Sequence, residues 1–320
     1  MNKFLVIQTA FLGDVILATS IVEKLYQFYP ESKIDFLLRK GNEGLLENHP
    51  IIDEVLIWNK NNNKYDNLKA ISKSVKGSHY DVIINLHRFA SSGLITAFSG
   101  AKQKIGFKKN PLSVAFTKRV EHTIGDDTHE IERNQQLIIH LTDKQSVNPK
   151  LYPSNKDYSD VESFKKSEYI CIAPTSVWFT KKLPQEQWIK LINKVSDKLT
   201  IYLLGGSEDV SQCEEIKKIS NNKNVVNLSG KLTILASAAL MQNAKMNYVN
   251  DSAPLHIASA MNAPVTAYFC STIPNFGFRP LSDNSVVIEV KEKLKCRPCG
   301  LHGKKECPEG HFNCGFKIEV

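Results

Sequence analysis

The stretch Asn250–His256 brings a carboxylate, a hydroxyl and an imidazole together between two expected elements. The apolar run before it predicts a strand, and the amphipathic run after it predicts a helix with Pro254 in its first turn. We expect Ser252 to cap this helix through its hydroxyl. The free amides and the positive dipole end of such a helix form a natural seat for a diphosphate. The spacing therefore predicts a nucleotide-binding site flanked by Asp251 and His256.

A second polar stretch, Thr9–Asp14, follows a short apolar run near the start of the chain. It holds one glycine, Gly13, which we expect in a tight turn, so it is not the glycine-rich dinucleotide fingerprint. Asp14 then lies at the mouth of the next predicted helix. Two roles remain open for this residue. It can cap the helix and favour its dipole, or it can act as a general base on a substrate hydroxyl.

The segment Pro174–Pro184 also follows an expected strand, and it carries hydroxyl and ammonium groups on one loop. Thr175, Ser176, Lys181 and Lys182 are the candidates. Such a loop can bind phosphate oxygens and neutralise the charge on a leaving diphosphate. A solvated basic loop is the alternative. We favour phosphate binding because this segment and the stretch described first follow strands of the same predicted sheet.

Two weaker signals follow other expected strands. In Leu204–Asp209 the paired glycines permit a close backbone approach, and Glu208 could accept a hydrogen bond from a ribose hydroxyl. Ordinary turn chemistry with a helix cap is the competing interpretation. Arg88 comes just after the strand expected over Asp81–Asn85, where its guanidinium could clamp an anionic acceptor group. A solvated loop arginine explains that position equally well.

The seven cysteines fall into two groups. Cys171, Cys213 and Cys270 lie in or near apolar runs and are expected to be small core residues. The other four crowd a tail over residues 296–314, and three states remain open for them: a structural zinc site, reduced thiols or disulfides. No catalytic role is expected for these four, which are Cys296, Cys299, Cys307 and Cys314.

These candidates must be positioned by an alternation of strands and helices along the whole chain. Apolar residues at helical spacing predict helices over Val15–Phe28, Gln185–Lys198, Ile234–Asn243 and Pro254–Met261. Short apolar runs predict parallel strands. In the first half these strands are Phe4–Gln8, Ile34–Leu38, Glu54–Ile57, Asp81–Asn85 and Gln103–Phe107, and in the second half Tyr169–Ala173, Thr200–Leu204, Val225–Leu228, Met246–Val249 and Val265–Phe269.

The polar stretch Leu141–Lys166 predicts a long surface loop, and we place the domain boundary there. The chain is therefore expected to form an α/β domain over residues 1–150 and a second α/β domain over 151–320. A cleft between two such domains, outside the carboxyl ends of the strands, is where a ligand is expected.

Composition narrows the class of protein. The chain has 320 residues, of which 42% are hydrophobic and 23% charged, with a formal net charge of +8. No aromatic-basic pattern or zinc-finger helix accompanies this charge, so we expect no nucleic-acid partner. An anionic membrane surface or a phosphorylated substrate suits a diffuse basic face. The N-terminal apolar run is interrupted by polar residues and lacks a signal-peptide cleavage site, and no stretch is long enough to span a membrane. These features favour a cytoplasmic protein that touches the membrane peripherally.

Three motifs taken together resemble the glycosyltransferase family 9 heptosyltransferases, which transfer heptose from ADP-heptose to the lipopolysaccharide inner core. They are Gln8–Asp14, Gly205–Asp209 and Asn250–His256, in the family's order. The run Tyr268–Phe276 is more similar to the second heptosyltransferase type than to the first, and the cysteine-rich tail is similar to one found in some members.

This resemblance implies a GT-B architecture, in which two Rossmann-like domains face each other across a cleft. The first would bind the acceptor, a lipid-linked oligosaccharide at the inner membrane surface, and the second the ADP-heptose donor. Transfer would be inverting and would need no metal, with Asp14 as the base and Lys181 on the diphosphate. The family's donor-binding block matches Asp251, Ser252, Ala253 and His256 here, although Ala253 stands where the family usually has glycine.

The Thr175–Lys182 segment matches the family only loosely, which leaves the choice between Lys181 and Lys182 open. Two rival functions are also retained. One is a GT-B transferase that uses a different nucleotide sugar, since the matched residues bind diphosphate and ribose. The other is a non-catalytic nucleotide- or glycan-binding protein of the same fold.

Overall fold

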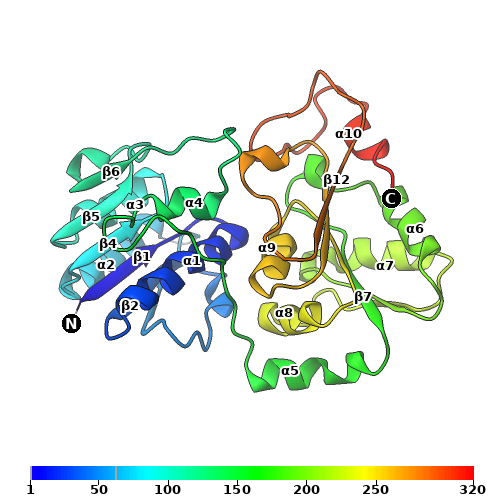
Figure 1. Cartoon of the computed structure of the whole chain (residues 1–320), viewed down its shortest axis with the longest axis horizontal. Coiled ribbons are helices and arrows are strands. Elements are labelled where there is room, and N and C mark those ends of the chain that lie inside the picture. Colours follow the sequence, from blue (N-terminus) through cyan, green and yellow to red (C-terminus); the bar gives the residue numbers. More distant parts are fainter. Residues whose placement is uncertain (1, 62) are drawn as a thin grey trace. The chain divides into compact units, whose positions relative to one another are not determined.

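The structure is a computed structural model that describes residues 2–61 and 63–320. The chain divides into two compact units (Figure 1). The first comprises Met1–Ile124 and Thr128–Tyr152, and the second comprises Gly125–Asp127 and Pro153–Val320. Each unit is built on a six-stranded parallel sheet. The α/β class predicted from the alternating pattern is therefore confirmed.

In the first unit the strand order is β3-β2-β1-β4-β5-β6, with β1 in the middle of the sheet. Ile7 at the end of β1 is in register with Leu37 of β2 and with Asn85 of β4. The strand order reverses between β1 and β4, and such a switch point is where parallel sheets bind ligands. The strands are β1 (Lys3–Ile7), β2 (Lys33–Arg39), β3 (Val55–Trp58), β4 (Val82–Asn85), β5 (Gln103–Phe107) and β6 (Lys118–Val120).

The helices of this unit form two packed pairs, α1 with α4 and α2 with α3. Helix α1 is buried over most of its length, and its last residues, 26–28, are exposed. Leu5, Ile7 and Ile83 of the sheet form one apolar cluster with Val75 of α2 and Ile95 of α3. The helical elements are α1 (Leu12–Phe28), η1 (Glu43–Leu45), α2 (Lys64–Gly77), α3 (Ala90–Ala97), η2 (Ser113–Ala115) and α4 (Glu130–Gln135).

The second unit repeats the arrangement with the strand order β12-β11-β10-β7-β8-β9. Its order reverses between β7 and β10, and Ala173 of β7 is in register with Val249 of β10. The two loops that follow these strands therefore start at the same level of the sheet. The strands are β7 (Tyr169–Ala173), β8 (Thr200–Leu203), β9 (Val225–Asn227), β10 (Asn247–Asn250), β11 (Val265–Phe269) and β12 (Ser285–Glu289).

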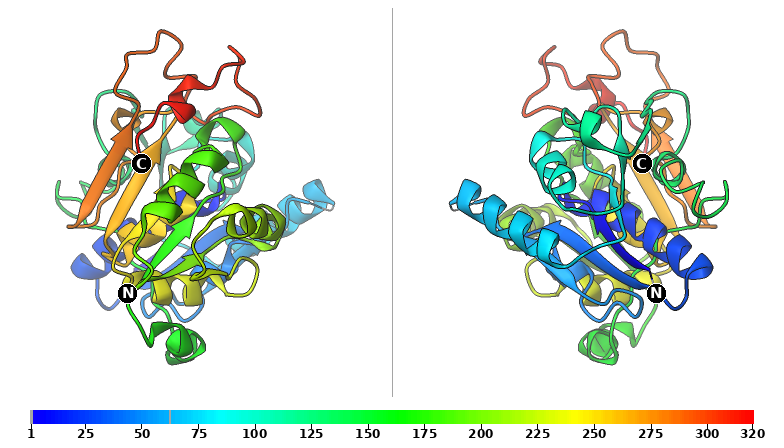
Figure 2. Two further views of the ribbon diagram at one scale, coloured as in Figure 1. Left: turned by 90° about the vertical axis from the view of Figure 1, so that its right-hand side faces the viewer. Right: turned by 90° about the vertical axis from the view of Figure 1, so that its left-hand side faces the viewer.

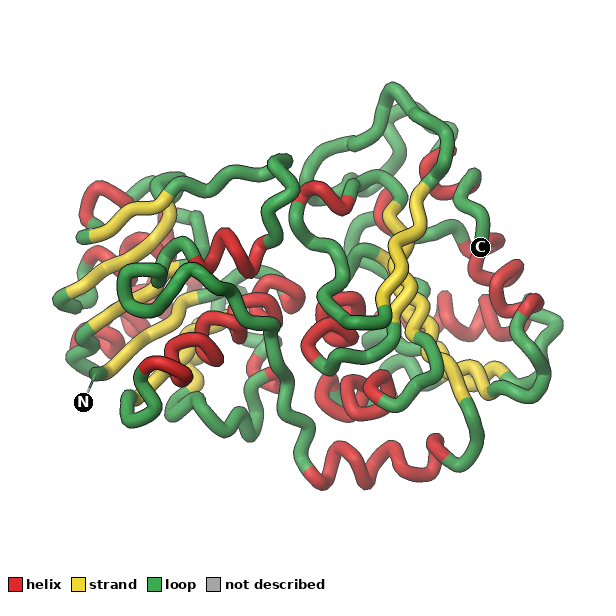
Figure 3. Tube along the Cα trace, viewed as in Figure 1, coloured by secondary structure: helices red, strands yellow, loops and turns green. Residues whose placement is uncertain are grey.

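The end of the chain completes the core of the second unit. Phe312, Cys314 and Ile318 are buried in one cluster with Leu183 and Trp188. Figure 2 shows this C-terminal segment in red beside α6, and Figure 3 draws the stretch between β12 and α10 as loop. The helical elements are α5 (Asn155–Val161), η3 (Glu162–Lys165), η4 (Phe179–Lys181), α6 (Gln185–Lys194), η5 (Ser207–Asp209), α7 (Val210–Ile219), α8 (Ile234–Gln242), α9 (Ala253–Ala260), η6 (Pro274–Phe276) and α10 (Asn313–Phe316).

The long loop predicted over Leu141–Lys166 is wrong in part, because α5 lies within it. A capping box begins this helix: Ser154 accepts a hydrogen bond from the backbone N–H of Asp157 at 3.3 Å, and the Asp157 carboxylate accepts the backbone N–H of Ser154 at 2.8 Å. Within the described residues, no helix combines the length and the apolar character that a membrane crossing requires.

Candidate functional site

The loops after β7 and β10 meet through an ion pair in the second unit. Lys181 Nζ lies 2.7 Å from Asp251 Oδ2. Asp251 is 4% exposed, and the Thr272 hydroxyl donates to the same carboxylate oxygen at 2.6 Å. A buried carboxylate needs such partners because an unpaired buried charge is strongly destabilising. The structure thus brings two of the predicted site residues together at the switch point of the sheet.

Asn250, the last residue of β10, fixes both ends of the Lys181 loop. Its side-chain carbonyl accepts the backbone N–H of Leu183 at 2.8 Å, and its amide donates to the Thr175 carbonyl at 3.2 Å. Asn250 is fully buried, and a buried amide group is normally fully hydrogen-bonded. Sequence reasoning singled out the residues beside it but assigned no role to Asn250 itself.

Helix α9 begins where the sequence predicts, but its cap differs. Ser252 occupies the N-cap position without a side-chain capping bond, and its hydroxyl instead points to the Asn250 carbonyl at 3.5 Å. The expected hydroxyl cap is therefore wrong, which leaves the first amides of the helix without that acceptor. Pro254 lies in the first turn as predicted. Ala253 opens the helix, and His256 is buried within it.

The other candidates on the Lys181 loop differ from Lys181 in burial and in their contacts. Thr175 is buried, whereas Ser176 and Lys182 are half-buried. Lys182 donates its backbone N–H to Phe179 at 3.0 Å, while the contact with Asp251 is made by Lys181. Of the two lysines, the geometry therefore joins Lys181 to the acidic residue of the site.

The glycine pair after β8 forms a turn that leads into a capped helix, which is the competing interpretation given above for this stretch. Asp209 accepts the backbone N–H of Gly206 at 2.8 Å and so begins a short helical turn. A Cβ on Gly205 would meet Asp209 Cβ at 2.8 Å, which explains why glycine is needed there. Glu208 is exposed on this turn.

In the first unit, Asp14 lies in the first turn of α1. Its Oδ2 accepts the backbone N–H of Phe11 at 3.2 Å, so the capping role is present. The side chain remains half-buried. Helix α1 begins at Leu12, before the predicted start at Val15. Gly13 therefore lies inside the helix, and the tight turn expected at this residue is wrong.

Cations gather at the carboxyl ends of four adjacent strands in the first unit. Lys60, beyond β3, donates to the carbonyl of Thr9 at 2.6 Å and to its hydroxyl at 3.1 Å. The same hydroxyl lies 3.0 Å from Nδ1 of His87, beyond β4. Arg39 ends β2 and lies over the ring of Phe11 at 4.8 Å. Lys60 and Arg39 were missed in the sequence, because their proximity depends on the strand order.

The electrostatics of this cluster follow from burial and from its own positive charge. Burial, together with the positive charges of Lys60, Arg88 and Arg39, lowers the pKa of His87 to about 3, so the imidazole is neutral at pH 7. Burial also lowers the pKa of Lys60 to about 8, with Arg39 and Lys64 adding to the effect. Lys60 is therefore mostly charged at neutral pH, and the cluster favours an anion.

The predicted acceptor residue Arg88 joins this cluster to a buried network. Its guanidinium lies 3.0 Å from Nδ1 of His122. The opposite nitrogen of that ring lies 3.3 Å from Glu130, which also accepts from Arg133 at 2.7 Å. Arg88 is thus fixed in direction rather than free in solvent, which is what a clamp on an anionic ligand needs.

Comparison with known proteins decides the family. The pattern of "Glycosyltransferase family 9 (heptosyltransferase)" matches residues 68–311. The chain belongs to glycosyltransferase family 9. This glycosyltransferase is 27% identical over 292 residues to lipopolysaccharide heptosyltransferase 3 of Escherichia coli K12, covering 86% of this chain and 84% of that protein. It is also 22% identical over 317 residues to lipopolysaccharide heptosyltransferase 1 of Campylobacter coli, covering 91% and 90%.

Solved structures of the family share the fold. The E. coli ADP-heptose lipopolysaccharide heptosyltransferase II superposes with a TM-score of 0.80 at 21% identity, covering 93% of this chain and 95% of that one. The E. coli heptosyltransferase WaaC with ADP gives a TM-score of 0.73 at 18% identity, covering 89% and 92%. These matches confirm the predicted GT-B fold of two Rossmann-like sheets.

Of the three states left open for the tail of this glycosyltransferase, the structure does not support a structural zinc site. Within residues 2–61 and 63–320, no group of three or more His, Cys, Asp or Glu side chains is placed to hold a metal ion. All seven cysteines are free thiols. Cys314 is a core residue, and burial raises the pKa of its thiol to about 12, away from the thiolate that zinc binds. Cys299 donates to the Cys296 carbonyl at 3.2 Å, and Cys307 accepts the Phe312 amide at 3.4 Å.

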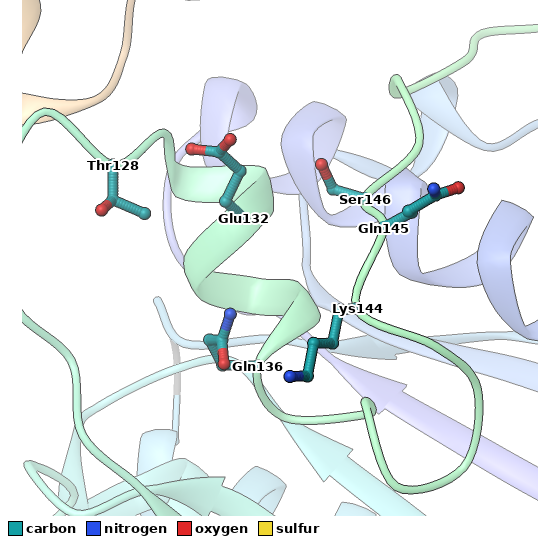
Figure 4. Close-up of a pocket in the computed structure, with 6 residues that line it drawn as sticks. All are labelled: Thr128, Glu132, Gln136, Lys144, Gln145 and Ser146. Atoms are coloured by element: carbon teal, nitrogen blue, oxygen red, sulfur yellow. The ribbon is translucent and has the colours of Figure 1, made fainter.

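A polar pocket on the first unit is lined by none of the predicted site residues. Figure 4 shows its lining, which comes from α4 and from the chain on both sides of this helix. The Glu132 carboxylate on its wall accepts the backbone N–H of His129 at 2.6 Å and so caps α4. This use of the carboxylate is structural. The lining residues are Thr128, Glu132, Gln136, Lys144, Gln145 and Ser146.

Proposed function

We propose that this glycosyltransferase transfers heptose from ADP-heptose to a lipopolysaccharide inner-core acceptor with inversion at the anomeric carbon. The names of its relatives support this donor and this acceptor. The observation that carries the proposal is the Lys181–Asp251 pair at the switch point of the second sheet. It places a cation beside the start of a helix whose first amides are not capped by Ser252.

The second unit, from about residue 151 onward, is the donor side of this proposal. Lys181 and the amides of α9 bind the diphosphate, and Ala253 opens that helix. Thr175, Ser176 and Lys182 complete the loop around the phosphates. Three more residues are assigned to the donor: Ser252, His256 and, for a ribose hydroxyl, Glu208.

The first unit, up to about residue 150, is the acceptor side. The cluster of Lys60, Arg39 and Arg88 offers positive charge for an anionic group on the acceptor. Asp14 lies in the first turn of α1, the helix that follows β1, and serves as the general base.

In the chemical step, the acceptor hydroxyl oxygen attacks the anomeric carbon of the donor while Asp14 accepts its proton. The bond between that carbon and the diphosphate oxygen breaks, and ADP leaves with the electron pair. Lys181 and the helix amides stabilise the charge that develops on ADP. Since these protein groups supply the positive charge, we propose that transfer requires no metal and that chelators leave the rate unchanged.

We place the reaction at the cytoplasmic surface of the inner membrane, where a lipid-linked acceptor meets a water-soluble donor. The net charge of +8 supports contact with an anionic surface. Sedimentation with vesicles that contain acidic lipids tests this location, and loss of binding at high salt is expected.

The test of the function is ADP release with ADP-heptose and a series of truncated lipopolysaccharides. Turnover with at least one acceptor is expected, and the series identifies which hydroxyl is used. UDP- and GDP-sugars serve as control donors. Turnover with one of these alone would favour a different nucleotide sugar, and donor binding without any ADP release would favour a non-catalytic protein.

A further inference from the structure

The cysteine-rich tail packs directly on the short helical turn that carries Lys181. Thr180 donates its backbone N–H to the Lys304 carbonyl at 3.1 Å, and its hydroxyl accepts the backbone N–H of Lys304 at 2.8 Å. The Ser271 hydroxyl donates to the same Thr180 oxygen at 2.9 Å. Thr180 is 1% exposed, so these bonds are shielded from water. The tail therefore fixes the residue immediately before Lys181.

Gly303 lets the tail approach the lysine side chain itself. Its φ is +76°, which glycine adopts without strain. A Cβ at this position would meet Lys181 Cγ at 2.8 Å and Trp178 Cβ at 3.1 Å. The contact is with the base of the lysine stem, so a side chain here could not be accommodated by moving the ammonium end alone.

Arg297 extends the same contact to the other partner of the ion pair. Its guanidinium donates to the carbonyls of Cys270 at 2.5 Å, Thr272 at 2.6 Å and Phe269 at 3.1 Å, all just at or beyond the end of β11. The Thr272 hydroxyl in turn donates to Asp251. One end of the tail thus holds the residue that orients Asp251, and the other end holds Lys181.

We infer that the tail segment 296–304 is a positioning element of the donor site, which we call the latch. It restricts the rotamers of Lys181 before the donor arrives, so less side-chain freedom is lost on binding. Arg297, Gly303 and Lys304 act through Lys181 and Asp251 rather than on the substrate. The inference rests on the proposed function, because it takes Lys181 as a ligand of the donor diphosphate.

A pair of matched glycine variants tests the latch. Gly303→Ala adds a methyl group against Lys181, whereas Gly310→Ala adds one at a φ of +69° with no atom within 4 Å. Both variants carry similar backbone strain, so only the contact differs. We expect the Kd for ADP-heptose to rise about tenfold in Gly303→Ala, comparable to weakening one charged hydrogen bond. Gly310→Ala should stay within about twofold of the wild type.

Substitution of Thr180 provides a second, independent test. Thr180→Ser keeps the hydroxyl that bonds the tail, and Thr180→Val keeps the shape but removes that hydroxyl. The valine variant should raise the Kd and the KM for the donor and also lower kcat, because Lys181 stabilises the departing ADP, and the serine variant should restore all three. A merely structural role would lower the melting temperature without this pattern. Donor affinity equal to the wild type in both Gly303→Ala and Thr180→Val would overturn the latch.

A crystal structure of Gly303→Ala separates the latch from the proposed function. We expect Lys181 Nζ to move out of the 2.7 Å contact with Asp251. If that distance is unchanged, the latch is wrong whatever the donor. If the wild type does not bind ADP-heptose but the distance increases in the variant, the latch stands as a device for holding Lys181 and the proposed donor is wrong.

Discussion

At the scale of single residues, Asp14 has one observed role and one proposed role, and one substitution can separate them. The carboxylate caps α1 through Phe11 and is the proposed base. Asparagine keeps an oxygen for the capping bond but cannot take up a proton at neutral pH. We therefore expect Asp14→Asn to lower kcat by roughly 100-fold or more, the range of general-base catalysis. Kd for the donor should be unchanged, since Asp14 belongs to the first unit.

The measurement is steady-state ADP release together with donor binding by calorimetry. Asp14→Ala is the comparison, because it removes the capping bond as well as the base. Equal and normal turnover in both variants would exclude Asp14 from the chemistry. Loss of activity in the alanine variant alone would show that the capping bond matters and the base does not.

Lys60 should give acceptor binding a pH dependence. Its pKa is lowered to about 8, so the charge is present below pH 8 and is lost as the pH rises beyond that value. We expect the KM for the acceptor to increase about tenfold between pH 7 and pH 9.5, as one charged contact is lost. Lys60→Arg, whose charge persists in this range, should flatten the profile. An identical rise in KM in that variant would show that another group titrates.

At the scale of elements, α5 depends on a cap that the sequence displays. Ser154→Ala removes the hydroxyl that begins the helix and should lower the free energy of unfolding by about 1 kcal/mol. Ser252→Ala is the matched control, because its hydroxyl makes no capping bond and should change the stability by less than about 0.5 kcal/mol. Urea denaturation of both variants measures the difference. A larger loss in Ser252→Ala would contradict the assigned caps.

The elements also show why the sequence revealed only part of the site. Asp251 and Lys181 follow apolar runs that are strands in any α/β arrangement, so their place at a sheet edge could be predicted. Lys60 and Arg39 meet only because β3, β2 and β1 are neighbours, an order that no local pattern specifies. The contact between Thr180 and Lys304 joins residues 124 positions apart.

The sequence left the state of the cysteine-rich tail open for a related physical reason. The spacing of Cys296 and Cys299 suits a metal site, but Cys314 is used to fill the core beside Trp188. Local spacing does not distinguish a ligand from a small apolar side chain. The sequence predicts one loop over Leu141–Lys166 because a helix as short as α5 has little periodicity to detect.

At the scale of the whole molecule, buried histidines make stability fall in acid. Burial lowers the pKa of His49 to about 4 and helps to lower that of His87 to about 3, both below the usual 6.5. Below pH 6.5 the unfolded chain therefore binds protons that the folded first unit does not. Each histidine should therefore lower the free energy of unfolding by about 1.4 kcal/mol when the pH falls from 7.5 to 5.5.

Urea denaturation at those two pH values measures this loss. His49→Gln should reduce the decrease by about 1.4 kcal/mol, since glutamine does not titrate. Asn48→Gln, a change at the adjacent residue, should leave the pH dependence as it is in the wild type. A decrease of the same size in His49→Gln and in the wild type would assign the acid sensitivity to other groups.

The central position of β1 has a consequence for how the chain is made. This strand is synthesised before both of its partners, and one of them, β4, follows only about 80 residues later. Until then, β1 can pair with β2 on one side only, and its other edge has no strand to pair with. Nascent chains of this enzyme should therefore bind ribosome-associated chaperones early in synthesis. They should aggregate when translation is faster than chaperone binding.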